Sequence, residues 1–279
     1  MTLEQKLDRL LDTLRSLESA IVAFSGGVDS AFLAKAAQVA LGDRALAVTA
    51  VSESYAEGEL ENAQALARQV GIRHEVVTSH EMRNPDYVKN APDRCYHCKT
   101  ELVDKLEDIQ KRYEGQYHYL TYGANLDDVG DFRPGMKAAE ARGVRAPLKE
   151  AELTKADIRE LSRRWDLPTW DQPAAACLSS RIPYGTPVTA EALSAIDRAE
   201  AFLRAEGFRQ VRVRHHEKIA RIEVPAADIP RFFESGLNER VSARLKEIGY
   251  TYVTLDLLGY RSGSLNEAIG KTPLLTISV

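Results

Sequence analysis

The sequence predicts an α/β protein in which a parallel sheet covered by helices is followed by a smaller α+β domain. Two observations carry this prediction. Up to about residue 165, short apolar runs alternate with amphipathic stretches, which is the pattern of successive βαβ units. Beyond residue 187 the pattern changes to a helix, two alternating strand-like runs, a second helix and a last strand. The 279 residues are enough for two domains, and we expect these at 1–170 and 188–279, with a linker at 171–187.

The composition is that of an ordinary soluble globular protein, with 44% hydrophobic and 28% charged residues. The net charge of −4 argues against a protein that binds nucleic acid through a basic surface. Charges interrupt the apolar positions of the N-terminal helix, and no apolar run reaches membrane-spanning length, so we expect a cytoplasmic protein. Three cysteines, an odd number, do not indicate a disulfide framework.

The stretch from Ala20 to Ser30, AIVAFSGGVDS, predicts the first strand-to-helix crossing. Its apolar run reads as a buried strand, and a glycine pair then leads into a helix that begins near Asp29. Because neither glycine has a Cβ, the backbone can approach a ligand closely, and the helix N–H groups favour an anion such as phosphate. No Lys-Ser/Thr pair follows as in a P-loop, and no third glycine completes a dinucleotide fingerprint. The alternative is a glycine turn with a Ser/Asp helix cap.

The rest of the first domain alternates strands and helices. We expect strands at 45–52, 74–79 and 117–123, and helices at 57–70, from Asp93 onward and at 154–165 with Thr154 as the N-cap. Residues 80–92 are polar and predict an irregular segment. In parallel βαβ units the carboxyl ends of the strands meet at one edge, where ligands bind.

An acidic loop, ANLDDVGDFRPG, follows the strand at 117–123. Its polar side chains are Asn125, Asp127, Asp128, Asp131 and Arg133. Carboxylates and an arginine at the end of a strand suit metal and substrate binding in the same crevice as the glycine loop. The alternative is a solvated surface turn.

Cys95 and Cys98 lie three residues apart at the start of a helix and therefore share one face. The same face continues through Leu102, Leu106 and Ile109, so we expect the cysteines to point inward, toward the sheet. Cys177, in the linker, is a third thiol that can approach from the opposite side of a crevice. Three thiolates without a fourth ligand fit a [4Fe–4S] cluster with one open iron better than a closed zinc site. Two small core residues and a thioredoxin-type dithiol are the alternatives for the pair.

Further polar residues occur in the linker and in the strand-like run VRVR. They are Ser179, Ser180 and Arg181, followed by Arg212 and Arg214. Strand alternation puts the last two arginines on one side of their strand, away from the valines. Arginine suits bidentate recognition of phosphate or carboxylate, although a solvated strand face is the alternative.

The pattern Ser-Gly-Gly-x-Asp-Ser resembles the pyrophosphate loop of the ATP pyrophosphatases, which split ATP between the α and β phosphates. The resemblance implies a Rossmann-like sheet of the adenine nucleotide alpha hydrolase type, with ATP and Mg²⁺ as ligands. It also implies that Asp29 acts in catalysis. The residues implied around ATP and its pyrophosphate are Ser25, Gly26, Gly27, Asp29, Ser30 and Gly123.

Several stretches together resemble the LarE family over nearly the whole chain: SGGVDS, RCYHCK, DDVGDFRPG, CLSSRIPYGTP, VRVRHHEKIARIEVP and YVTLDLLGYRSG. LarE proteins are ATP-dependent sulfur transferases that build the nickel-pincer nucleotide of lactate racemase. The resemblance implies that the carboxylates of pyridinium-3,5-biscarboxylic acid mononucleotide are adenylated and converted to thiocarboxylates. The residues implied for substrate binding are Asp128, Asp131, Arg133, Ser180, Arg181, Glu200, Arg212 and Arg214.

The sequence departs from the best-known LarE proteins at the cysteine from which they donate sulfur, because that position aligns with Ala176. It resembles instead a branch in which three cysteines hold a [4Fe–4S] cluster and an extra sulfide on the open iron is the donor. By that resemblance Cys95, Cys98 and Cys177 hold the cluster and act in catalysis. We therefore expect an external sulfur source and a homo-oligomer, a hexamer packed through the smaller domain, with no nucleic-acid or membrane partner. The alternatives are a cluster-dependent tRNA thiolase, an ammonia-using ligase such as a GMP or NAD synthetase, and a non-enzymatic nucleotide-binding or iron–sulfur scaffold.

Overall fold

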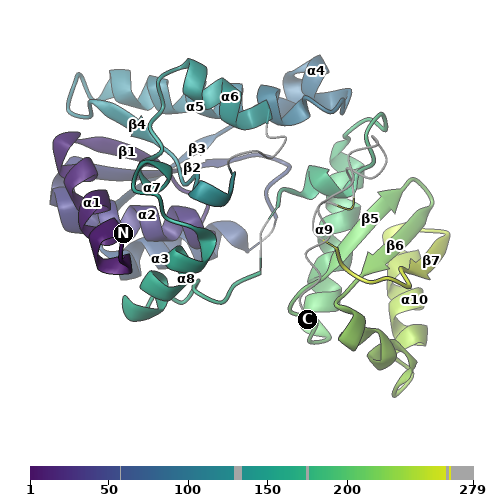
Figure 1. The fold of residues 1–279 in the computed structure, drawn as a ribbon. Coiled ribbons are helices and arrows are strands. Elements are labelled where there is room, and N and C mark those ends of the chain that lie inside the picture. The colour runs from purple at the N-terminus through teal and green to yellow at the C-terminus, as the bar shows by residue number, and fades with distance from the viewer. Residues whose placement is uncertain (57, 129–133, 174–175, 262–263, 265–279) are drawn as a thin grey trace. The chain divides into compact units, whose positions relative to one another are not determined.

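The structure is a computed structural model that describes residues 1–56, 58–128, 134–173, 176–261 and 264. The chain divides into two compact units (Figure 1). The first consists of Met1–Tyr87 and Asp93–Ala175, and the second of Val88–Pro92 and Ala176–Val279. Within the described residues, no helix combines the length and the apolar character needed to cross a membrane.

The first unit is built on a four-stranded sheet in the order β3-β2-β1-β4, and all its strand pairs are parallel. This arrangement confirms the predicted Rossmann-like α/β class. The strands are β1 (Ala20–Ala23), β2 (Ala45–Val51), β3 (Arg73–Thr78) and β4 (Tyr119–Thr121). β4 ends two residues before Gly123, and the chain returns to its edge at Arg145, which forms a parallel bridge with Thr121.

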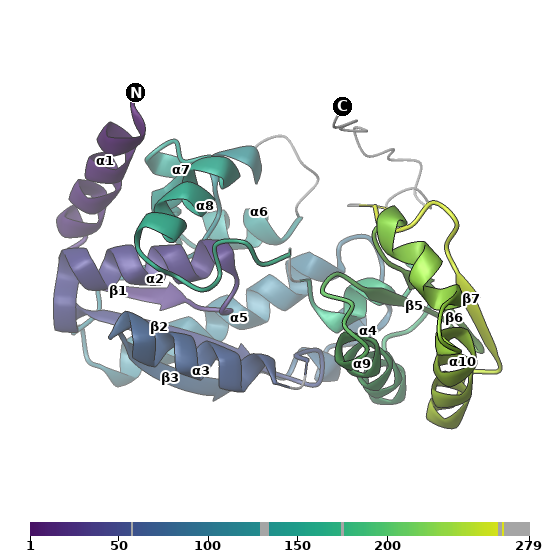
Figure 2. The ribbon, with the colours of Figure 1, turned by 90° about the horizontal axis from the view of Figure 1, so that it is seen from below.

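Helices cover both faces of this sheet (Figures 1 and 2). On one face lie α1 (Leu3–Ser16), α2 (Val28–Leu41), α3 (Glu59–Val70), α7 (Pro147–Glu150) and α8 (Lys155–Arg164). On the other face lie α5 (Arg94–Arg112) and α6 (Pro134–Ala141). α2 packs against the sheet, α1 and α8, which explains why nearly all its residues are small or apolar.

Three parts of the first unit differ from the prediction. Residues 80–92 are not irregular throughout, because they form the short helices η2 (Glu81–Arg83) and α4 (Pro85–Val88). α6 and α7 were not predicted, since four to eight residues are too few to show a helical period. α3 begins at Glu59 after the left-handed Gly58 and not at residue 57, which lies outside the described residues.

The second unit has a three-stranded sheet. β5 (Arg212–His216) and β6 (Ile219–Glu223) form the antiparallel hairpin predicted around residues 216–218, and β7 (Tyr252–Leu255) runs parallel to β6. Helices α9 (Ala190–Ala205) and α10 (Leu237–Ile248) share one core with this sheet, and η5 (Ala226–Phe233) lies between β6 and α10. The predicted α+β character is confirmed.

The predicted linker is more ordered than expected. Within it, η4 (Leu178–Arg181) belongs to the second unit and is largely buried. The second unit also takes in Val88–Pro92, where the fully buried Asn90 donates its side-chain amide to the carbonyl oxygens of Pro183 and Thr186, both at 2.8 Å. Gly185 N–H in turn donates to the Asn90 carbonyl at 3.0 Å. No local pattern in the sequence predicts this excursion.

Candidate active site

The turn between β1 and α2 is held by hydrogen bonds among its own residues. Ser30 Oγ donates to the Gly27 carbonyl at 3.1 Å and accepts from the Ser25 N–H at 3.2 Å. Gly26 has a φ of +76°, and a Cβ there would lie 3.2 Å from Ala63 Cβ on α3. Glycine is therefore required at this position by both conformation and space.

The N-terminus of α2 is left open for a ligand. Gly27 occupies the N-cap position and provides no side-chain cap, so the first-turn N–H groups of this 14-residue helix face outward with the positive end of its dipole. A helix N-terminus without a side-chain cap suits an anion, and the predicted phosphate at this turn stays a prediction.

Replacing Gly27 by alanine tests whether a phosphate uses this site. The new Cβ would meet only Ser25 Oγ among the described atoms, at 3.5 Å, and the φ of −77° suits any residue. We expect the melting temperature to change little and the ATP affinity, measured by calorimetry, to fall about tenfold or more, or ~1.4 kcal/mol. Gly26→Ala is the contrasting variant, because it should destabilise the fold itself. An unchanged ATP affinity in Gly27→Ala would contradict a phosphate at this helix end.

Gly123 brings the end of β4 against the same helix. A Cβ at Gly123 would lie 3.0 Å from the Ser30 nitrogen and 3.1 Å from the Asp29 carbonyl carbon. β1 and β4 are neighbours in the sheet, and the strand order reverses between them. Ligands of open α/β sheets bind at such a switch point. The structure therefore brings Gly123 to the pyrophosphate-loop residues predicted with it.

Asp29 is paired with a lysine that the sequence did not reveal. Its Oδ2 accepts a hydrogen bond from Lys155 Nζ at 2.7 Å, and the Lys155 N–H donates to Asp127 Oδ2 at 2.8 Å. Thr154 is the N-cap of α8, as predicted, but no local signal connects its neighbour with a residue 126 positions earlier.

The other carboxylate oxygen of Asp29, Oδ1, is buried and has no hydrogen-bond partner among the described residues. A buried, unpaired carboxylate oxygen is costly unless a ligand satisfies it. Carboxylate oxygens are ligands that Mg²⁺ prefers, so Asp29 fits the Mg²⁺ that the resemblance to the ATP pyrophosphatases implies.

The acidic loop closes on itself at its first turn. The Asn125 N–H donates to Asp128 Oδ2 at 2.9 Å, and the Asp127 N–H donates to Asn125 Oδ1 at 2.9 Å. Asp128 is therefore buried and positioned by this turn, while Asp131 and Arg133 lie outside the described residues.

The cysteine pair lies on the first two turns of α5 but does not point into the core. Cys95 is exposed and Cys98 is half-buried, so the predicted inward orientation is wrong. The core contribution of α5 to the sheet starts at Leu102 and Val103, because the helix begins before the point where it meets the sheet. Exposure leaves the thiol of Cys95 accessible to a ligand.

The start of α6, which follows the acidic loop, packs on the same part of α5. A Cβ at Gly135 would lie 2.9 Å from the Cys95 carbonyl oxygen. The loop that begins at Gly123 beside α2 therefore leads to a helix that begins beside the cysteine pair.

Cys177 is exposed and free, and it belongs to the second unit. Its carbonyl and that of Ala176 accept hydrogen bonds from Arg181 Nη1 at 2.9 and 2.5 Å. Neither unit alone brings three cysteines together, and the described residues contain no group of three His, Cys, Asp or Glu side chains arranged to hold a metal. The meeting of Cys177 with the pair stays a prediction.

Arg181 and Glu200 form a buried ion pair in the second unit. Arg181 Nε and Nη2 donate to the two Glu200 oxygens, both at 2.8 Å, and the Val213 N–H donates to Glu200 at 3.0 Å. Burial alone would raise the pKa of the Glu200 carboxyl, but the hydrogen bonds and charge of Arg181, with the charge of Arg212, outweigh it and lower that pKa. Glu200 is thus an ionised positioning group for Arg181.

Arg212 and Arg214 are buried, which excludes a solvated strand face. Arg214 donates to Glu223 at 2.7 Å and to the Ser180 carbonyl at 2.9 Å. The Arg212 guanidinium lies 5.8 Å from the Tyr260 ring centroid, and burial, followed by the nearby Arg181 charge, lowers its pKa. Arginines held in place in this way are suited to bidentate recognition of an anionic group.

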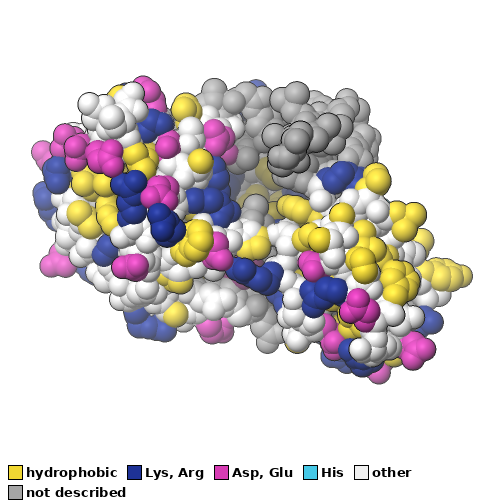
Figure 3. Space-filling view, turned by 60° about the horizontal axis from the view of Figure 1, so that its bottom comes forward, with side chains coloured by type: hydrophobic (Ala, Val, Ile, Leu, Met, Phe, Trp, Pro, Cys, Tyr) yellow, Lys and Arg dark blue, Asp and Glu magenta, His cyan; other side chains and the backbone are white. Residues whose placement is uncertain are grey.

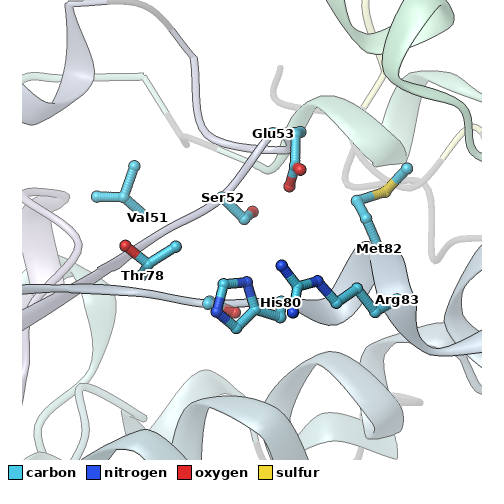
Figure 4. Close-up of a pocket in the computed structure, with 8 residues that line it drawn as sticks. Val51, Ser52, Glu53, Thr78, His80, Met82 and Arg83 are labelled. Carbon is cyan, nitrogen blue, oxygen red and sulfur yellow. The ribbon is translucent and has the colours of Figure 1, made fainter.

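A cavity of about 340 Å³ lies at the carboxyl ends of β2 and β3. Figure 4 shows Ser52 and Glu53, after β2, on one side of it and His80 and Arg83, after β3, on the other. Because β2 is the neighbour of β1 in the sheet, this cavity is on the same edge as the pyrophosphate loop. The sequence did not predict it.

Comparison with known proteins agrees with this geometry. The NAD synthase family matches residues 2–120. An uncharacterized protein of Synechocystis is 47% identical over 270 residues, which cover 96% of this chain and 100% of the relative. The pyridinium-3,5-bisthiocarboxylic acid mononucleotide synthase of Lactiplantibacillus plantarum is 38% identical over 278 residues, or 99% of each chain. Full-length similarity of this degree, together with the pyrophosphate loop at the switch point of the sheet, shows that the chain belongs to the LarE family of pyridinium-3,5-bisthiocarboxylic acid mononucleotide synthases.

Proposed function

We propose that this enzyme uses ATP to adenylate the carboxylates of pyridinium-3,5-biscarboxylic acid mononucleotide and converts them to thiocarboxylates. In each round a carboxylate oxygen attacks the α phosphorus of ATP and pyrophosphate leaves. A sulfur nucleophile then attacks the acyl carbon, and AMP leaves with the original oxygen. The observation that carries the proposal is the open N-terminus of α2 beside Asp29 and Lys155, in a chain similar over its full length to a synthase of this product.

The first unit would promote the release of pyrophosphate. The N–H groups of α2 and the Lys155 ammonium can bind the oxygens on which negative charge grows as pyrophosphate departs. Asp29 would hold Mg²⁺ through Oδ1 while it keeps Lys155 in place through Oδ2. With the phosphates at α2, the nucleoside would extend toward the cavity at the ends of β2 and β3.

The second unit would hold the pyridinium nucleotide. That substrate carries a phosphate and two carboxylates, and Arg181, Arg212 and Arg214 supply three guanidinium groups on rigid, buried supports. Rigid arginines bind such groups with little loss of side-chain entropy. We assign the phosphate and the reacting carboxylate to these arginines and to Ser180.

The thiols fit the three-cysteine cluster in their chemistry. The pair shares one face of α5, and Cys95 and Cys177 are exposed. A bound [4Fe–4S] cluster would offer an open iron to sulfide from an external source. Ala176 has no thiol, which supports turnover without loss of a side-chain sulfur.

A homo-oligomer assembled through the second unit is part of the proposal. Figure 3 shows hydrophobic side chains gathered on the surface of this unit. Phe233, Tyr252, Leu257 and Leu258 are all more than 60% exposed, which is unusual for large apolar residues of a monomer.

The proposed function is tested by anaerobic purification with iron and sulfide counting, followed by assays of pyrophosphate release. We expect release to require pyridinium-3,5-biscarboxylic acid mononucleotide, and the product to gain sulfur when sulfide and the cluster are present. Bulk tRNA and ammonia serve as the competing acceptors. Release driven by either of them, and not by the pyridinium nucleotide, would replace this function by a tRNA thiolase or an ammonia-using ligase. A protein that binds ATP without releasing pyrophosphate would be a scaffold.

A further inference from the structure

A buried carboxylate joins the two loops that border the cavity. Glu81, the first residue of η2, is only 4% exposed. It accepts hydrogen bonds from Ser52 Oγ at 2.5 Å, from Ser54 Oγ at 2.9 Å and from Ser79 Oγ. Three hydroxyl donors offset the cost of burying the charge. Because two of the serines follow β2 and the third follows β3, Glu81 fixes the carboxyl ends of both strands relative to each other.

The loop after β2 also reaches the pyrophosphate loop. Tyr55 directly follows the serine pair, and its hydroxyl donates to the Ser25 carbonyl at 3.1 Å. Burial, followed by the charge of Glu59, raises the pKa of this phenol, so the hydroxyl keeps its proton and remains a donor at neutral pH. A carbonyl fixed from outside the turn also fixes the peptide plane it shares with the Gly26 N–H.

The loop after β3 makes a third connection, to the helix that carries the cysteine pair. The His80 N–H donates to Glu101 Oε1 at 3.0 Å, and Glu101 lies one turn beyond Cys98 on α5. Glu81 and the residues beside it therefore link the cavity, the pyrophosphate loop and α5 through hydrogen bonds within the first unit. None of these groups is used by the chemistry described above.

We propose that Glu81 is a positioning residue for ATP: it sets the 52–55 loop so that Tyr55 holds the Ser25 carbonyl and turns the N–H groups of the pyrophosphate loop toward the phosphates. The inference deepens the proposed function, on which it rests. Glu81 acts through Ser54 and Tyr55 and touches no substrate itself. Its loss should therefore weaken ATP binding while the protein stays folded and its affinity for the pyridinium nucleotide is unchanged.

The experiment compares Glu81→Gln, Tyr55→Phe and the double variant by calorimetric ATP binding and by the KM for ATP in pyrophosphate release. Each single variant should weaken ATP binding about threefold to tenfold, the effect of one or two lost hydrogen bonds. The double variant should be no weaker than Glu81→Gln alone, because both changes break the same chain of contacts. Additive effects, or a folded Glu81→Gln protein with parental ATP affinity, would overturn the inference.

Controls separate positioning from general stability. Glu75 on β3 accepts a hydrogen bond from Tyr113, so Glu75→Gln and Tyr113→Phe break a glutamate–tyrosine contact elsewhere in the same unit. They should leave ATP affinity unchanged. If Glu81→Gln does not fold, the ATP affinities of Ser54→Ala and Tyr55→Phe test the inference instead. Parental ATP affinity in both variants would overturn it. ATP binding needs no pyridinium nucleotide, so failure of the proposed substrate does not affect this result.

Discussion

Cys95→Ala is expected to abolish both the visible absorbance of a bound iron–sulfur cluster and all transfer of sulfur. The exposed thiol of Cys95 is one of three proposed ligands, and two thiolates do not hold a [4Fe–4S] cluster. The adenylation site that we propose, at α2, Asp29 and Lys155, is unchanged in this variant, so a burst of substrate-dependent pyrophosphate should remain. Iron content, the absorbance spectrum and pyrophosphate release measured on one preparation check all three statements.

His97→Ala is the control for this change. His97 lies on the same turns of α5 and contributes no thiol. Its Nε2 atom is 3.7 Å from Asp93 Oδ2. It should keep both cluster and activity. Sulfur transfer by the Cys95→Ala protein would contradict the cluster, and so would loss of one H₂S from Cys177 after a single turnover, since that result would mean self-sacrifice.

The second large effect is expected at Asp29. Asp29→Asn removes the negative charge that holds Lys155 and would bind Mg²⁺, and it replaces one of the two carboxylate oxygens by an amide nitrogen. Pyrophosphate release should therefore slow by about 10²- to 10³-fold. Lys155→Met should cost a similar factor, and the double variant little more, because the two groups act as a unit. Stopped-flow or coupled assays of pyrophosphate formation measure the rate.

Lys149→Met is the matched control for Lys155→Met. Lys149 also pairs with a carboxylate, Glu140, at 3.0 Å, and its side chain is 34% exposed against 32% for Lys155. It should leave the rate unchanged, and iron content should be normal in all these variants. A rate for Asp29→Asn within threefold of the parent would remove Asp29 from the mechanism.

The sequence was sufficient to predict those elements of the fold that follow from local pattern. The apolar run before Ser25 and the glycines after it predicted β1, the turn and α2, and the alternation around residues 212–223 predicted the hairpin. These features depend on backbone preferences and on which face of an element is apolar.

The remainder depends on contacts between distant residues. Lys155 meets Asp29 across 126 positions, and Glu81 gathers serines from two separate loops. Helical spacing correctly grouped Cys95 with Cys98, but spacing cannot show where a helix leaves the sheet, and so the predicted burial failed. The pairing of Asn90 with the 183–186 turn has no local signature at all.

That pairing affects how the protein can be dissected. A single cut in the 171–187 segment would not yield two intact halves, because Val88–Pro92 would remain with the N-terminal fragment. The C-terminal fragment would then lose the Asn90 amide and leave the carbonyls of Pro183 and Thr186 without this donor. The two fragments should therefore misfold or aggregate when each is expressed alone. Experiments on either unit are better carried out on the full-length protein.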